Sequence, residues 1–212
     1  YPGNGITFYK EAFDKNGLAN AVVKYVLHLN AGEKTELFAA VPFYGKNLPV
    51  EANLSTDISA EFAQSDDFWK SKTGHIKFNL PPSADQIVTT YKSNLGYILV
   101  NRDKAGIQPG SRSYERSWIR DGALTSSALL KSGIVQEVKD FIVWYAAHQY
   151  ENGKVPCVVD FRGPDPVPEH DSHGELIYLI REYFNYTHDT AFLKSNNSHV
   201  LKAVGYIESL VS

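Results

Sequence analysis

The feature of this sequence that most constrains its fold is the alternation of long and short connections between helical segments. Apolar residues recur with a helical period over residues 83–102, 121–131, 134–150, 171–186 and 200–211. The long connections 103–119 and 151–170 alternate with short turns at 132–133 and 187–189. Helix hairpins with short turns at one end and long loops at the other predict a toroid of helical pairs. Both long loops, which are commonly functional, then lie on one rim.

The first 65 residues carry patterns of β-structure instead. Residues 21–29 and 36–43 are rich in β-branched and aromatic residues and are separated by a turn at 30–33, and residues 57–62 are a candidate third strand. Two or three strands are too few for a complete sandwich. We therefore expect residues 1–65 to be the C-terminal part of an antiparallel, sandwich-like β-domain. Residues 66–82 follow as a linker with a short helix at 65–72.

Composition excludes several classes of partner. The chain has 21 Lys and Arg against 24 Asp and Glu and no basic run, so we expect no nucleic-acid partner. No apolar run approaches the roughly 20 residues that span a bilayer, so we expect no membrane partner. The single Cys157 cannot form an internal disulfide. Because the chain starts at Tyr1 and contains no Met, we expect it to be part of a longer polypeptide.

The cellular location is open from sequence. Three Asn-x-Ser/Thr sequons, at Asn53, Asn185 and Asn196, favour a secreted or periplasmic protein over a cytoplasmic one.

The first polar motif is YERSWIRDGAL, residues 114–124, at the end of a long connection. The donor fork of Arg120 beside the acceptor Asp121 can grip two neighbouring hydroxyls of a sugar, while Trp118 covers the apolar face of the ring. The alternative is structural: Asp121 is a helix N-cap and Arg120 is its salt-bridge partner.

The second motif is PDPVPEHDSHGELIYLI, at the end of the other long connection. Five polar residues crowd into seven positions: Glu169, His170, Asp171, His173 and Glu175. Ser172-x-x-Glu175 before an apolar run is typical of a capping box. A metal site would use the two histidines with Asp171 or Glu175, but their spacing matches no standard site, so we expect no metal and no cofactor.

Acid–base chemistry is another possibility for this motif, with Glu169 and Asp171 as the candidate catalytic groups. Inverting hydrolysis of a glycoside needs two opposed carboxylates, about 6.5–9.5 Å apart. One cluster supplies only one side of a substrate.

The two motifs together resemble a known family. Trp-Ile-Arg-Asp-Gly at 118–122 is similar to the signature that opens the second helix of glucoamylase-like (α/α)6-barrel glycoside hydrolases. Glu-x-Asp-x-x-Gly-Glu-Leu at 169–176 is similar to the pattern that opens their fourth helix in bacterial glucoamylase and trehalase relatives. The resemblance implies an α+β chain by segments, in which a β-sandwich precedes an incomplete (α/α)6 toroid whose first five helices are residues 83–212.

The resemblance also implies a function. The chain would be part of an inverting glycoside hydrolase acting on an oligosaccharide or polysaccharide. Arg120 and Asp121 would hold hydroxyls of the cleaved sugar and Trp118 would wall the pocket, while Asp171 and Glu175 would orient and bind. The family's general acid lies at the start of the sixth helix and its base further on, so both catalytic groups would lie outside this chain.

Departures from the family keep alternatives open. The family usually has Gln where this chain has Glu169, and it has no general counterpart of His170 or His173. These two histidines, with Arg120 and Arg162, could instead pair with the carboxylate of a uronate. A polysaccharide lyase or a glycoside phosphorylase on the same toroid is one alternative, and a non-catalytic carbohydrate-binding protein is another. A half-toroid is also expected to leave the inner helix faces, including Phe141, Leu176 and Ile180, without partners.

Overall fold

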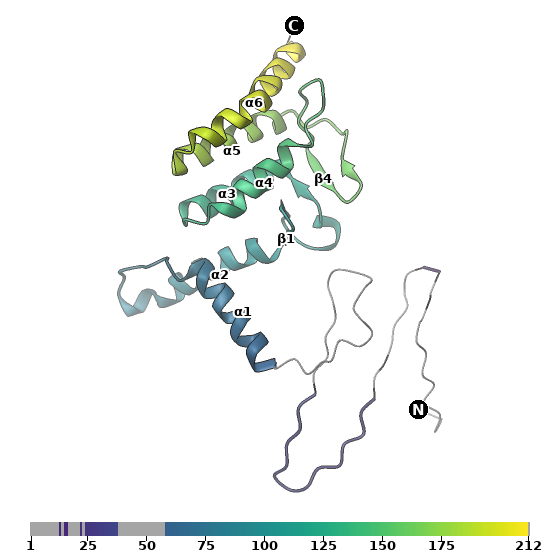
Figure 1. Ribbon diagram of the computed structural model, residues 1–212, viewed down its shortest axis with the longest axis vertical. Coiled ribbons are helices and arrows are strands. Elements are labelled where there is room, and N and C mark those ends of the chain that lie inside the picture. The colour runs from purple at the N-terminus through teal and green to yellow at the C-terminus, as the bar shows by residue number, and fades with distance from the viewer. Residues whose placement is uncertain (1–12, 14, 17–21, 23, 38–57, 212) are drawn as a thin grey trace. The chain divides into compact units, whose positions relative to one another are not determined.

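The computed structural model describes residues 13, 15–16, 22, 24–37 and 58–211, in two compact units, Tyr1–Ile58 and Ser59–Ser212 (Figure 1). In the first unit the turn predicted at 30–33 is confirmed: the Glu33 N–H donates to the Asn30 carbonyl at 3.0 Å, and Gly32 takes a φ of 81°. No strand forms at residue 22 or over 24–37. The described part of the predicted strand 21–29 is therefore irregular, and most of the predicted strand 36–43 lies outside the described residues.

The third candidate strand was a wrong prediction. Residues from Ile58 onward belong to a helix, α1 (Ile58–Thr73), which includes the short helix predicted at 65–72 and crosses the predicted boundary between residues 65 and 66. Ala60, Glu61 and Ala63 are strong helix formers, and they outweigh a short apolar–polar alternation. Lys72, near the end of α1, forms an ion pair with the largely buried Glu137.

The five helices predicted from the apolar period are confirmed. They are α2 (Asp85–Val100), α3 (Ile119–Lys131), α4 (Gln136–Ala146), α5 (Ser172–Thr187) and α6 (Thr190–Val211). The last begins at Thr190 rather than 200, because Asp189 caps it by accepting the Phe192 N–H at 2.9 Å. His188 in the left-handed region makes the short turn from α5 to α6.

Each long connection folds into small antiparallel strands. In the first, β1 (Arg102–Asp103) pairs with β2 (Gly106–Ile107). In a second sheet β4 (Val158–Asp160) lies between β3 (Ser117–Trp118) and β5 (Gly163–Pro164), with Ser117 opposite Val159 and Val159 opposite Pro164. Two one-turn 3-10 helices, η1 (Pro82–Ala84) and η2 (Arg112–Tyr114), complete this unit. The second sheet therefore joins the two long connections, and the architecture is mixed helix with small antiparallel sheets.

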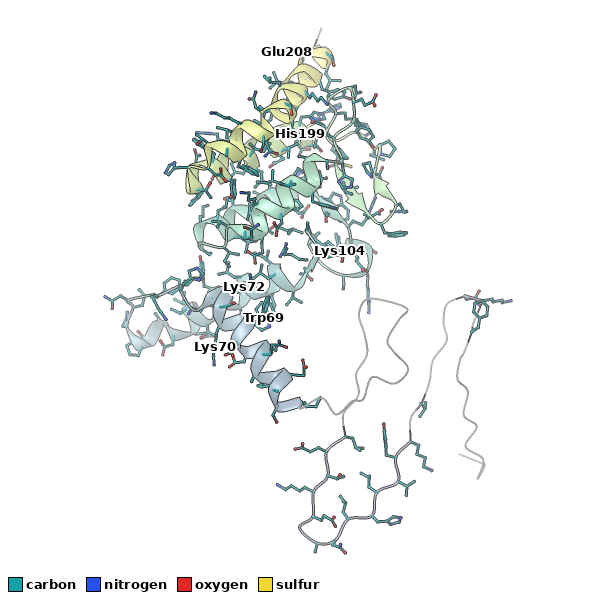
Figure 2. The ribbon with its side chains drawn as sticks, viewed as in Figure 1. Trp69, Lys70, Lys72, Lys104, His199 and Glu208 are labelled. Atoms are coloured by element: carbon teal, nitrogen blue, oxygen red, sulfur yellow. The ribbon has the colours of Figure 1, made fainter. Side chains whose placement is uncertain are left out.

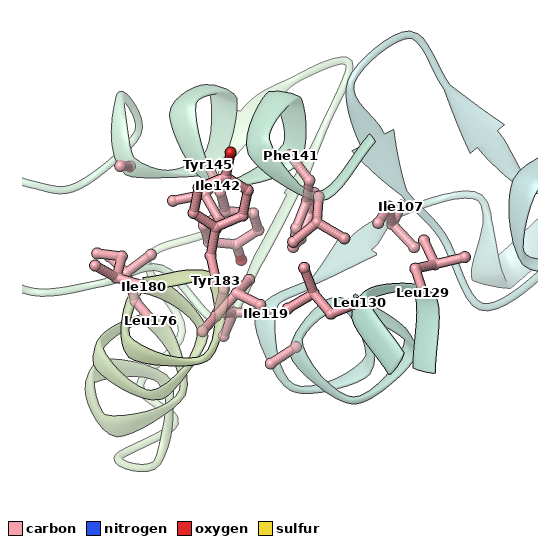
Figure 3. Close-up of a cluster of buried hydrophobic side chains, with 14 of the residues drawn as sticks. Ile107, Ile119, Leu129, Leu130, Phe141, Ile142, Tyr145, Leu176, Ile180 and Tyr183 are labelled. Atoms are coloured by element: carbon pink, nitrogen blue, oxygen red, sulfur yellow. The ribbon is translucent and has the colours of Figure 1, made fainter. Parts of the chain in front are cut away.

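The core lies between α3, α4 and α5 (Figure 3). Phe141, Leu176 and Ile180 are fully buried within it, so the expectation that a half-toroid leaves them without partners was wrong. The three helices pack against one another, and β2 contacts α3 and α4. Gly122 lets the Phe141 ring of α4 pack directly on α3, since a Cβ there would lie 2.2 Å from Cζ of Phe141.

Two further findings bear on the sequence expectations. The sequon residue Asn196 is buried on α6, and its side-chain amide donates to the Phe192 carbonyl at 2.9 Å, so it is not accessible for glycosylation in this fold. Among the described residues, no helix combines the length and the apolar character that crossing a bilayer requires.

Candidate functional site

The structure brings the two polar motifs together at the N-terminal ends of α3 and α5. Arg120, in the first turn of α3, donates from Nε to Oδ2 of Asp171 at 2.6 Å and from Nη2 to Oε2 of Glu169 at 2.9 Å. The sheet explains this meeting, because β3 runs directly into α3 and the β4–β5 hairpin lies in the connection that leads to α5. The sequence expectation that both motifs share a rim is met by these contacts.

The carboxyl groups of the site are held in different states. The Arg120 guanidinium lowers the pKa of Asp171 through a direct hydrogen bond. Burial raises the pKa of Glu175, and the nearby Asp171 charge raises it further. Asp171 is therefore a firmly ionised acceptor, whereas Glu175 keeps its proton to a higher pH than an ordinary glutamate.

A hollow of about 500 Å³ lies beside these groups, and we call it the α3–α5 hollow. It is lined by Leu124, Asp171, Gly174, Glu175 and Tyr178. Leu124 is 62% exposed and Tyr178 is 37% exposed. The Tyr178 hydroxyl donates to Oγ of Ser127 at 3.3 Å, which fixes the ring between the two helices. Carboxylates beside exposed apolar surface suit the mixed polar and apolar faces of a sugar.

Leu124 and Tyr178 were not among the residues predicted from sequence. The helical period could have indicated both, since Leu124 lies one turn after Arg120 and Tyr178 lies one turn after Glu175.

The alternatives for the first motif are resolved in part. Asp121 is not the N-cap of α3, because Trp118 occupies that position and no side chain caps the helix. Arg120 does form salt bridges, as the structural alternative predicted, but with Glu169 and Asp171 across the site. Trp118 packs against the Tyr114 ring, with a centroid distance of 6.1 Å, and does not line the α3–α5 hollow.

The two histidines of the second motif have different positions. His170 is exposed at the end of the connection. His173 is fully buried: its Nδ1 accepts the Val155 N–H at 3.1 Å and its ring lies edge-on to Tyr206. Burial lowers the pKa of His173, so it is neutral at pH 7. His173 anchors the long connection to α5 and α6, and the structure does not bring it to the predicted sugar-binding rim.

The capping box predicted at Ser172 and Glu175 is wrong. The N-cap of α5 is Asp171, and Ser172 is the first helical residue, with its Oγ buried and without a hydrogen-bond partner. The helix begins one residue earlier than a Ser172 cap requires, so Ser172 lies inside the first turn and its hydroxyl is buried. Among residues 58–211 and the other described positions, no three His, Cys, Asp or Glu side chains gather as metal ligands would.

No protein-family model matches this chain, and neither the curated proteins nor the solved structures contain a match to it.

Proposed function

We propose that this chain supplies the sugar-binding wall of an inverting glycoside hydrolase that acts on an oligosaccharide or polysaccharide. The observation that carries the proposal is the meeting of Arg120 with Glu169 and Asp171 beside the α3–α5 hollow. The (α/α)6 toroid, of which this chain would form the first part, and the preceding β-domain belong to the same proposal.

Each group has a role that follows from its surroundings. A guanidinium carries five N–H donors, and the two bonds to Glu169 and Asp171 leave others for substrate hydroxyls. Ionised Asp171 accepts hydrogen bonds from sugar hydroxyls, and its negative charge favours an oxocarbenium-like transition state. Tyr178 and Leu124 contact the apolar face of the ring.

The chemical step needs two groups that this wall does not provide in opposed positions. An acid must protonate the leaving oxygen while a base on the other face of the sugar activates water. We assign both to residues outside this chain. The raised pKa of Glu175 makes it the best-suited proton donor on the wall itself.

The test is hydrolysis by the full-length gene product carrying Arg120→Ala, with Arg181→Ala as the matched control. Arg181 is exposed on α5 and does not line the hollow. Loss of one charge-assisted hydrogen bond to substrate, worth about 1.5–3 kcal/mol, should lower kcat/KM about 10- to 100-fold. Release of reducing sugar from a panel of oligosaccharides is the measurement.

The outcomes separate the alternatives. Equal activity of the two variants would refute the assignment. Sugar binding by calorimetry without turnover would indicate a carbohydrate-binding protein, and an ultraviolet-absorbing unsaturated product would indicate a lyase. Phosphate-dependent turnover would indicate a phosphorylase.

A further inference from the structure

A second cavity, of about 780 Å³, shares no residue with the α3–α5 hollow. Its lining side chains come from the β1–β2 hairpin, η2 and β3, the C-terminal end of α4, and the β4–β5 hairpin. Four of the lining residues are cationic, Lys104, Arg112, Arg116 and Arg162, and three are acidic, Asp103, Glu115 and Asp160. We call it the basic cavity after its four cations.

Two of these cations are paired with carboxylates. Arg116 donates from Nε to Oδ2 of Asp160 and from Nη2 to Oδ2 of Asp165, both at 2.8 Å. Arg162 donates to the same Asp160, whose side chain is only 3% exposed. These guanidiniums lower the pKa of Asp160 well below its usual range. The carboxylate therefore stays charged and keeps its ion pairs with Arg116 and Arg162.

The other two cations are held differently. Neither Lys104 nor Arg112 has a salt bridge to any residue in the described part of the chain. Both have left-handed backbone conformations, with φ of 53° and 59°. Outside glycine, His188 is the one other described residue with a positive φ. Two of three such residues therefore line one cavity.

This strain points to a role for the side chains. Glycine or asparagine would adopt a left-handed conformation more cheaply than lysine or arginine. Lys104 occupies the two-residue turn between β1 and β2, where Asp103 pairs with Gly106, and it projects from the hairpin (Figure 2). Strained residues cluster at ligand-binding sites, so two strained cations without salt bridges beside one cavity support a ligand-binding role for their charges.

The remaining walls offer apolar surface. Phe161, at the tip of the β4–β5 hairpin, is 96% exposed, and the Arg162 guanidinium lies 5.5 Å from its ring centroid. Trp144 lines the cavity from α4 with the His148 ring 4.9 Å away. The exposed Phe161 ring and the half-buried Trp144 ring beside donor-rich cations match a sugar ring that carries an anionic substituent.

We propose that the basic cavity binds an oxyanion-bearing sugar residue of an anionic oligosaccharide. Lys104 and Arg112 contact the oxyanion and Phe161 stacks on the sugar ring. The oxyanion is the carboxylate of a uronate or the sulfate of a sulfated sugar. This inference takes from the proposed function that the ligand is a carbohydrate. It concerns a separate site, and it adds that the carbohydrate is anionic.

The experiment compares Lys104→Gly/Arg112→Gly with a control that loses the same charge, Arg181→Ala/Lys194→Ala, both on exposed helix surface. The probes are short oligogalacturonate, sulfated dextran oligosaccharide and unsulfated dextran of the same length, at constant salt near 0.15 M, with inorganic sulfate as a fourth. Calorimetry gives the affinity of each. Glycine at both positions also relieves the backbone strain, so the unfolding midpoint should stay level or rise by a few degrees.

We expect binding of oligogalacturonate or sulfated dextran but not of unsulfated dextran, and a loss of at least about 30-fold in the glycine variant, since each charge-assisted contact is worth roughly a factor of ten. The preferred anionic probe identifies the oxyanion. Equal affinity of the glycine and control variants overturns the proposal, as does equal affinity for inorganic sulfate and for the sulfated sugar.

The Arg120→Ala variant separates this inference from the proposed function. It should lower kcat/KM for hydrolysis about 10- to 100-fold and keep the affinity of the basic cavity for the anionic probe. If hydrolysis depends on Arg120 while the unaltered protein binds no anionic probe, the inference fails and the proposed function stands.

Discussion

Replacing Gly122 with alanine should force apart two helices that the core holds together. Gly122 lies in the Trp-Ile-Arg-Asp-Gly motif, and a Cβ at this position would lie 2.2 Å from Cζ and 2.5 Å from Cε1 of Phe141. Phe141 is fully buried against Trp144 and Tyr145, so its ring has little room to move away. The variant must shift α3 relative to α4 or move the ring out of its preferred rotamer.

The size of the effect follows from two opposing contributions. Overpacking a buried site costs about 1–3 kcal/mol. Exchanging glycine for alanine within a helix stabilises by about 0.5–1 kcal/mol. Gly205 on α6 is the matched control, because nothing lies within 4 Å of a Cβ built there, so Gly205→Ala keeps only the gain. The two variants should differ by about 1–3 kcal/mol, or about 2–12 °C in Tm.

Urea unfolding followed by far-ultraviolet circular dichroism measures this difference. Phe141→Leu supplies a second test, since the shorter side chain relieves the clash. The double variant Gly122→Ala/Phe141→Leu should be more stable than the sum of the single losses predicts, by at least about 0.5 kcal/mol. If Gly122→Ala is as stable as Gly205→Ala, or if the two changes add strictly, the packing described for α3 and α4 is wrong.

Three further predictions concern the same unfolding free energy. Burial lowers the pKa of His173 and of His199. The unfolded chain, with a histidine pKa of about 6.5, therefore binds protons more strongly. The stability that these histidines contribute should be complete above about pH 6.5 and decrease as the pH falls towards 5. Urea titrations at pH 7.5 and 5.0 measure this decrease, and His173→Gln should make it smaller. An unchanged decrease in that variant would contradict the prediction. Lys72→Met leaves Glu137, whose side chain is 8% exposed, without its partner. The single variant should lose about 1–3 kcal/mol of stability at pH 7, because a buried charge is left without its partner. The double variant Lys72→Met/Glu137→Met should regain most of this loss, and no loss in the single variant would argue against the pair. Ser172→Ala should be neutral or stabilise by up to about 1 kcal/mol in the same assay, because its buried hydroxyl has no partner, whereas a loss of about 0.5–2 kcal/mol would restore the capping box.

The candidate site was partly predictable from sequence. The motifs containing Arg120 and Asp171 were recognisable because each ends a long connection at the start of a helical period. The contact between them depends on the pairing of Ser117 with Val159, which are 42 positions apart in the chain. Side-chain roles were less predictable, because an exposed ligand and a buried anchor look alike: His173 and His170 lie in one motif, and only one of them is exposed.

By itself the sequence determined the five helices from α2 to α6 and the short turns between paired helices, because the apolar period and the turn residues are local properties of the chain. It misjudged residues 57–62, where a short alternation competed with helix propensity. Only the tertiary structure decided that Gly122 admits the Phe141 ring, that Ser172 is buried in α5, and that Lys104 and Arg112 line one cavity. Burial, close approach and backbone strain depend on which distant segments of the chain contact one another, and local sequence patterns do not indicate those contacts.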